Sequence, residues 1–434
     1  MKASFLKLAS VGLLAAGFTG TAAAEWTKSY VIEWNEPAMY YGAETGVIDP
    51  GSDCPKGSNP EPDWIKVLTD AGYTKQEATW LRDPSHPFRI PNHGQNQMAF
   101  RGKDRANIYV HPESTPDPGL TPVTGIIGEG FDLDGNPNNG FTSPDGRTGI
   151  DNEFYHALGC WMTYRGPARQ SASALSKNDE MRNGSWTVVI VVHGQGKDPM
   201  NDNNVQVGFY NSADPMVKDA MGNIARDYTF SIAPDQRFEG IFKAKTVAGV
   251  IVSTEPAKEI WMRDPSYTRE LQLLQARIEL EMKPDGSLKG LVGGYRPWHE
   301  IYRGWVDARG SVIEQLTWVQ LPGVYYALKR NADYSPEGAN GEKTHISFAL
   351  RVDAIPAYVV TPDATEKALQ VVSYKDIAPP SEGHIPAVYF QRLIVDGIVR
   401  RRDGTVPGGP DVVIPPPTSL AAVEGLPNLG ENSK

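Results

Sequence analysis

Short acidic and amide side chains gather between residues 131 and 152 of this 434-residue chain, a stretch we call the acidic loop. They alternate with glycine and proline, which favour turns. Calcium in proteins takes about six to eight oxygen ligands from carboxylates, amides and backbone carbonyls, so a loop of this composition suits that ion. The residues that we expect to bind calcium are Asp132, Asp134, Asn136, Asp145 and Asp151.

The spacing within the acidic loop departs from that of an EF-hand. An EF-hand requires a glycine in the middle of its loop and a bidentate glutamate at its end. Counting from Asp132 places Pro137 and Ser143 at those positions. A start at Asp134 also lacks the glycine. The loop would therefore bind calcium with an irregular geometry, or its Asp and Asn side chains only cap successive turns by accepting hydrogen bonds from backbone amides.

Two short clusters offer acid–base chemistry. Glu153 and His156 follow the acidic loop, and His299 and Glu300 follow a tryptophan later in the chain. Either pair could supply a general acid and base, although such residues are more often surface or helix-capping residues. The signatures of serine hydrolases, zinc proteases and nucleotide-binding proteins are absent from the sequence. The paired carboxylates of a glycosidase have no sequence signature, because their separation is a property of the folded chain.

Residues 1–24 have the features of a secretory signal peptide. Lys2 and Lys7 accompany an apolar stretch that ends in three alanines at Ala24. We expect the mature chain to start at Glu25 and to be periplasmic or secreted. No later segment has the roughly 18 consecutive apolar residues that a membrane-spanning helix needs.

The only two cysteines are Cys54 and Cys160. Export would place them in an oxidising compartment, so we predict a disulfide between them, with two separate buried thiols as the alternative. In the chain-entropy model such a long loop closure adds about 4 to 5 kcal/mol to the free energy of unfolding. The formal net charge of −10 disfavours binding to nucleic acid or to an anionic membrane.

The remaining periodicity predicts a mainly β fold. Residues 187–192 form an apolar, β-branched run, and residues 276–282 alternate between apolar and polar side chains before a Pro-Asp-Gly turn. We predict an antiparallel β-sandwich or jelly-roll-like core over about 150–296, with helical insertions and long surface loops.

The predicted core belongs to a single large domain of residues 25–402. Helical periodicity follows the core over about 298–332, where Pro322 is expected to break or kink a helix. Residues 403–434 are rich in proline and glycine and predict an extended tail.

Together these features predict an exported binding or accessory protein of the bacterial envelope that is stabilised by calcium. Its expected partner is a polysaccharide or an envelope protein. The 10 tryptophans and 18 tyrosines would suit stacking on sugar rings, although they suit core packing equally well. One alternative is an exported polysaccharide hydrolase or lyase. Another is a structural subunit that contacts an envelope complex through its proline-rich tail.

Overall fold

A computed structural model describes residues 25–40, 50–59 and most of 103–360. The gaps within the last range are 104–105, 107, 166–168, 170, 184–186, 213, 234–238, 263–269 and 307–313. A few positions between 63 and 79 and two short strands at 393–395 and 398–400 are also described. The predicted signal peptide and the predicted tail lie outside the described residues.

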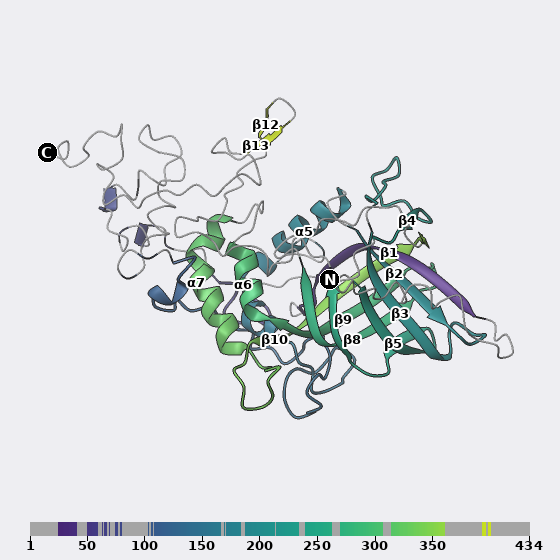
Figure 1. The fold of residues 1–434 in the computed structure, drawn as a ribbon. Coiled ribbons are helices and arrows are strands. Elements are labelled where there is room, and N and C mark those ends of the chain that lie inside the picture. Colours follow the sequence, from purple (N-terminus) through teal and green to yellow (C-terminus); the bar gives the residue numbers. More distant parts are fainter. Residues whose placement is uncertain are drawn as a thin grey trace, which may run out of the picture.

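Most of the strands belong to one antiparallel sheet, seen at the right of Figure 1. Its strands are β1 (Trp26–Pro37), β2 (Thr187–Gly194), β3 (Asp202–Ser212), β5 (Glu239–Val247), β6 (Val250–Ser253), β7 (Ala257–Met262), β8 (Leu271–Met282), β9 (Leu288–Pro297) and β10 (His345–Pro356). Two smaller pairs are β4 (Thr229–Ser231) with β11 (Tyr358–Val360), and β12 (Leu393–Val395) with β13 (Ile398–Arg400).

The main sheet closes on itself. With the short β7 set aside, each strand pairs with the next one in the chain, and the last strand, β10, pairs with β1. The ring is completed where β6 pairs with β8, with Ile251 opposite Leu280. The result is an eight-stranded antiparallel barrel. The predicted antiparallel, β-rich class is confirmed, but the main sheet forms a barrel in place of the predicted sandwich or jelly roll.

The barrel interior is filled with side chains. Along β5, Phe242, Ala244 and Thr246 are buried, while the residues between them are exposed. This period of two is expected for strands with one face toward a core. Val207 on β3 and Val292 on β9, which are part of the same hydrophobic core, are also fully buried. Eight strands enclose a space of about the size that side chains can fill, so the interior is a packed core.

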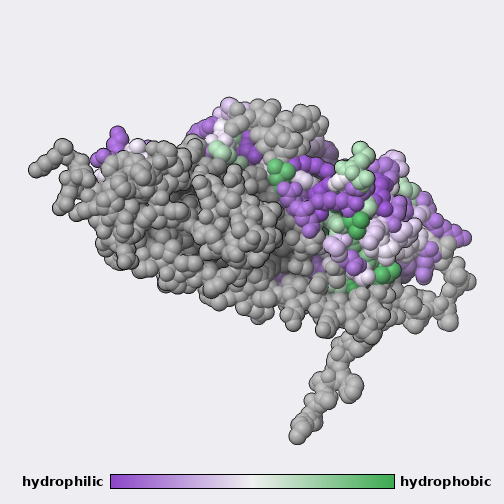
Figure 2. Space-filling view, turned by 90° about the horizontal axis from the view of Figure 1, so that it is seen from above, coloured by the Kyte–Doolittle hydropathy of each residue, from purple (hydrophilic) through white to green (hydrophobic). Residues whose placement is uncertain are grey.

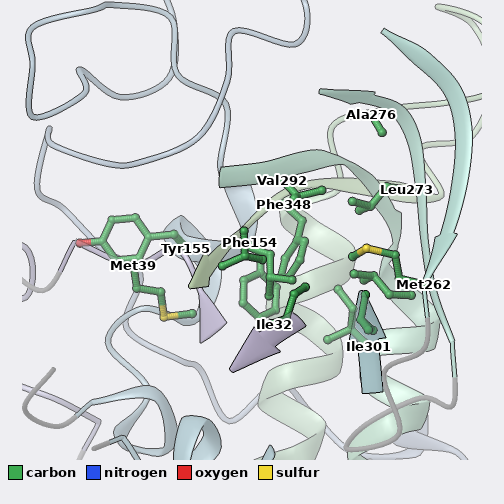
Figure 3. Close-up of a cluster of buried hydrophobic side chains, with 14 of the residues drawn as sticks. Ile32, Met39, Phe154, Tyr155, Met262, Leu273, Ala276, Val292, Ile301 and Phe348 are labelled. Carbon is green, nitrogen blue, oxygen red and sulfur yellow. The ribbon is translucent and has the colours of Figure 1, made fainter. Parts of the chain in front are cut away.

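Helices close the end of the barrel at which β9 ends and β10 begins. They are α4 (Glu153–Leu158), α5 (Ala172–Arg182), α6 (Trp298–Val306) and α7 (Glu314–Asn331), with two short 3-10 helices at Pro112–Ser114 and Met162–Tyr164. Figure 1 shows α6 and α7 side by side at this end. Phe154 of α4 packs edge-on against Phe348 of β10, with ring centroids 5.0 Å apart, and Figure 3 shows both rings near Ile32 of β1.

Helix α7 runs through Pro322 without interruption, so the predicted break is wrong, while the alternative of a kink at this position stays a prediction. Tight packing on both sides of the proline accounts for its tolerance, because Leu321 and Val324 are fully buried. Tertiary burial can offset the hydrogen bond that proline removes from a helix. None of the described helices is long and apolar enough to cross a membrane.

Candidate metal centre

The acidic loop lies folded on the outer wall of the barrel. Backbone bridges join Phe131 to Asp151 and Phe141 to Ile150, so the loop returns along its own path. Gly149 makes the close return possible, because its φ is +77° and a Cβ atom there would lie 2.8 Å from the carbonyl oxygen of Asn136. Only glycine adopts this conformation without strain.

The fold brings three of the predicted ligands together. Asp132, Asp134 and Asp151 each have a carboxylate oxygen within 4.8 Å of the others. Asp151 is the buried member of the three, with 7% of its surface exposed. Its Oδ2 accepts hydrogen bonds from the backbone amides of Leu133, at 2.7 Å, and Asp134, at 3.2 Å. We call these three carboxylates the acidic triad.

Crowding of negative charge perturbs the acidic triad. The pKa of Asp151 is raised to about 6, mainly because burial removes water from its carboxylate and further because Asp134 and Asp132 are negatively charged. Two like charges 4.8 Å apart repel each other by roughly 1 kcal/mol in water and about 3 to 4 kcal/mol at an effective dielectric constant of about 20. A cation bound among the three oxygens would turn this repulsion into attraction.

The acidic triad has no ion pair with any basic side chain among the residues that the structure describes. Other carboxylates of the same region do have an arginine partner. Glu129 pairs with Arg351, whose Nε donates to it at 2.5 Å, and Asp53 pairs with Arg165. The triad therefore lacks the counter-charge that Glu129 and Asp53 have, and unbalanced negative charge is the property that a cation site requires.

The other two predicted ligands take part in turns. Asp145 accepts hydrogen bonds from Ser143 and Arg147, and the first of these is the main reason why its pKa is lowered. The side chain of Asn136 accepts a hydrogen bond from the backbone amide of Asn138 at 3.2 Å. Neither side chain joins the acidic triad, so turn chemistry explains this part of the loop.

Two arginines and one aromatic ring attach the acidic loop to the barrel. Arg147 donates both terminal nitrogens to Glu279 of β8, at 2.6 and 3.2 Å, and Arg351 of β10 holds Glu129 just before the loop. Phe131 fills the space above Gly293 of β9, where a Cβ atom would lie 2.7 Å from its ring. The loop thus rests on three adjacent strands, which gives the triad a rigid support.

A second acidic group lies beside the acidic triad. Glu153 and His156 of α4 are joined by a 2.8 Å hydrogen bond, which is the main reason why the pKa of His156 is raised. Asp333, which follows α7, accepts a hydrogen bond from the amide of Ser347 at 2.7 Å. The pKa of Asp333 is raised to about 7, mainly by burial and further by the charges of Glu153 and Asp151. Sequence reasoning missed Asp333, because only the fold brings it near residues far away in the chain.

The second predicted acid–base pair does not form one site. Glu300 is fully buried at the start of α6, whereas His299 is exposed beside it. The pKa of His299 is lowered by partial desolvation and then by the charge of Arg303. A catalytic pair must face the same reacting group, and these two side chains point to different environments.

The predicted disulfide is present between Cys54 and Cys160, and both residues are fully buried. Structural disulfides persist in oxidising compartments, so this bond indicates a location outside the cytoplasm. The bond lies just beyond α4, which follows the acidic loop directly. It therefore connects the loop region to residues 50–59.

The described tryptophans are not arranged for stacking on sugar rings. Trp161 and Trp305 are among the most deeply buried side chains, and their ring centroids lie 4.9 Å apart. Among the tryptophans whose burial the structure describes, none is exposed. Among the residues that the structure describes, the exposed aromatic side chains are those of Tyr228 and Tyr358, at 44% and 63% exposure.

No protein family, curated protein or solved structure gives a match to this chain. The functional conclusions therefore depend on the geometry of the sites.

Proposed function

We propose that the acidic triad binds one calcium ion and that the protein is a calcium-stabilised binding or accessory protein, periplasmic or secreted. The observation that supports this most is the approach of Asp132, Asp134 and Asp151 to within 4.8 Å without a basic partner among the described residues. The pKa of Asp151 is raised mainly by burial and further by the charges of Asp134 and Asp132, and a bound cation would lower it.

The chemistry of the acidic triad favours calcium over other metals. The candidate ligands are oxygen atoms only, which disfavours zinc and copper, since those ions prefer histidine and cysteine. Magnesium demands a near-octahedral shell, whereas calcium accepts irregular shells that include backbone carbonyls and water. The acidic loop also contains backbone carbonyls such as that of Asn136, which lies close to Gly149.

We assign the ion a scaffolding role. An ion at the acidic triad would join the start of the loop, at Asp132, to its end at Asp151, two residues before the first residue of α4. Bound ions commonly order loops of this composition. The surface that such a scaffold presents would contact a polysaccharide or an envelope protein. Figure 2 shows a mainly hydrophilic described surface on one face, with small separate apolar areas, which suits a polar partner of this kind.

Calcium titration and thermal unfolding test the proposal. We expect the protein, after metal removal with EDTA and exchange into EDTA-free buffer, to bind added calcium at a single site by calorimetry, and its melting temperature to rise on binding. Asp151→Asn should abolish both effects. Asp219→Asn is the matched control, because Asp219 also caps a turn with its carboxylate but lies in another loop. An unchanged melting temperature and no calcium heat in the parent protein would refute the site.

A second candidate function is hydrolysis or elimination on a polysaccharide, and one observation favours it. Asp333 has a pKa of about 7 beside Glu153. A neutral carboxylic acid near a second carboxylate is the pairing that glycosidases use. Product release from a panel of polysaccharides, measured for the parent protein and for Asp333→Asn, tests it. Activity that survives in Asp333→Asn, or no activity on any polymer, would remove this candidate.

A further inference from the structure

Residues 50–59 contact the chain just before the acidic loop. The backbone carbonyl of Asp53 accepts hydrogen bonds from the amides of Thr124, at 2.9 Å, and Gly125, at 3.2 Å. The two backbones are so close that a Cβ atom on Gly125 would lie 2.7 Å from the Cα of Asp53. Asp53 therefore holds the chain at Thr124 and Gly125, just before the acidic loop.

The same short segment contacts the chain just after the acidic loop. The hydroxyl of Tyr155, on α4, donates to the carboxylate of Asp53 at 3.3 Å. The amide of Asn59 donates to the carbonyl of Cys160 at 2.8 Å, and the disulfide joins Cys54 to Cys160. Residues 50–59 therefore hold both ends of the loop, and the disulfide is their covalent attachment.

A buried ion pair makes this attachment cooperative. The side chains of Asp53 and Arg165 are 2% and 4% exposed and form a direct ion pair. Arg165 also approaches the Sγ of Cys54 at 3.2 Å and the carbonyl of Gly159 at 3.3 Å. Moving residues 50–59 away would separate these buried charges, which is strongly unfavourable. The ion pair therefore holds residues 50–59 in place together with the disulfide.

We infer that the Cys54–Cys160 disulfide is a redox-sensitive clamp on the two ends of the acidic loop, and that its reduction allows residues 50–59 to release those ends. In that step a dithiol supplies two electrons and two protons, the S–S bond becomes two thiols, and the dithiol becomes a disulfide. Both cysteines are fully buried, so the reductant reaches them when residues 50–59 open. The barrel strands, which pair with one another and not with this segment, stay folded.

Hydrogen exchange measured by mass spectrometry tests the clamp in EDTA, so that the result does not depend on calcium. We compare the oxidised full-length protein, the same protein reduced by a dithiol, and a Cys54→Ala/Cys160→Ala variant. The expected result is at least about a tenfold loss of protection at residues 131–152 in the reduced and variant proteins, with β2, β3 and β9 unchanged. Val207→Ala, in the barrel interior, is the control for general destabilisation.

Three results would overturn the inference. They are unchanged protection of the acidic loop after reduction, equal loss of protection in the loop and the barrel, and failure of the double cysteine variant to fold. Gly125→Ala gives an independent measurement with the disulfide intact. Its Cβ atom would push Asp53 away from the loop, so protection at residues 131–152 should fall in this variant as well. Normal protection there would contradict the role of Asp53.

Discussion

Replacing Asp151 with asparagine should make the calcium-free protein less sensitive to pH. Asparagine keeps an oxygen that can accept the hydrogen bonds from Leu133 and Asp134, but it carries no charge and does not titrate. The variant therefore isolates the electrostatic cost of the buried carboxylate from its role in the turn.

The expected magnitude follows from the pKa of Asp151, which folding raises from 3.8 to about 6. At pH 5 the group is charged in the unfolded chain and protonated in the folded protein, so the folded state binds more protons. Stability from this group is present at low pH and is lost as pH rises through the folded pKa. Integration between pH 5 and pH 8 gives a loss of roughly 1.4 kcal/mol in the parent protein. The variant also lowers the pKa of Asp333, which adds to the difference in the same direction.

Urea unfolding in calcium-free buffer at four values between pH 5 and pH 8 measures this difference. Groups that do not interact with Asp151 contribute equally to both proteins and cancel. In calcium at about 100 times the dissociation constant, the parent protein should gain about 2.7 kcal/mol, whereas the variant should gain nothing. Parallel pH curves for the two proteins without calcium would refute the assignment of a buried, crowded carboxylate at this position.

Three further predictions concern the loop, the clamp and the core. Gly149→Ala should lower the free energy of unfolding by more than Gly135→Ala does. Both glycines have a positive φ, but of the two only Gly149 has backbone atoms within 3 Å of the added Cβ atom. Urea unfolding of the two variants measures the difference, and equal losses of stability would contradict this prediction. Arg165→Met should cost about 3 to 5 kcal/mol by the same assay, since it leaves Asp53 buried without its partner, and a loss under about 1 kcal/mol would contradict a buried pair. Phe348→Ala should lower the free energy of unfolding by about 3 to 5 kcal/mol, because the ring is buried in the core. Calorimetric unfolding should show a lowered melting temperature, and an unchanged melting temperature would contradict the core position of this ring.

The acidic loop was predictable because its signal is local. Asp, Asn and Gly within a few positions of one another indicate turns whatever the rest of the fold is. Which of the carboxylates meet is decided by the return of the loop along its own path. The disulfide was predictable from the count of two cysteines in a chain with export features. Asp333 carried no such signal, because it reaches Glu153 only through the packing of α7 against α4 and the return of the chain into β10.

The barrel was not predictable from strand periodicity. A strand in a sandwich and a strand in a barrel both alternate between buried and exposed residues, so the pattern of 276–282 fits either architecture. The difference is decided by which strands pair. Here β6 turns back onto β8, and β10 returns to β1, and neither partner can be read from the alternation.

The pairing of β1 with β10 links folding to the order of synthesis. Tyr30 lies opposite Pro356, so the first strand waits for a partner 356 − 30 = 326 positions later. Contacts so distant in the chain form slowly. A chain with this topology cannot close its barrel until β10 has been made. Removal of either terminal strand would open the ring and expose two unpaired edges to other chains.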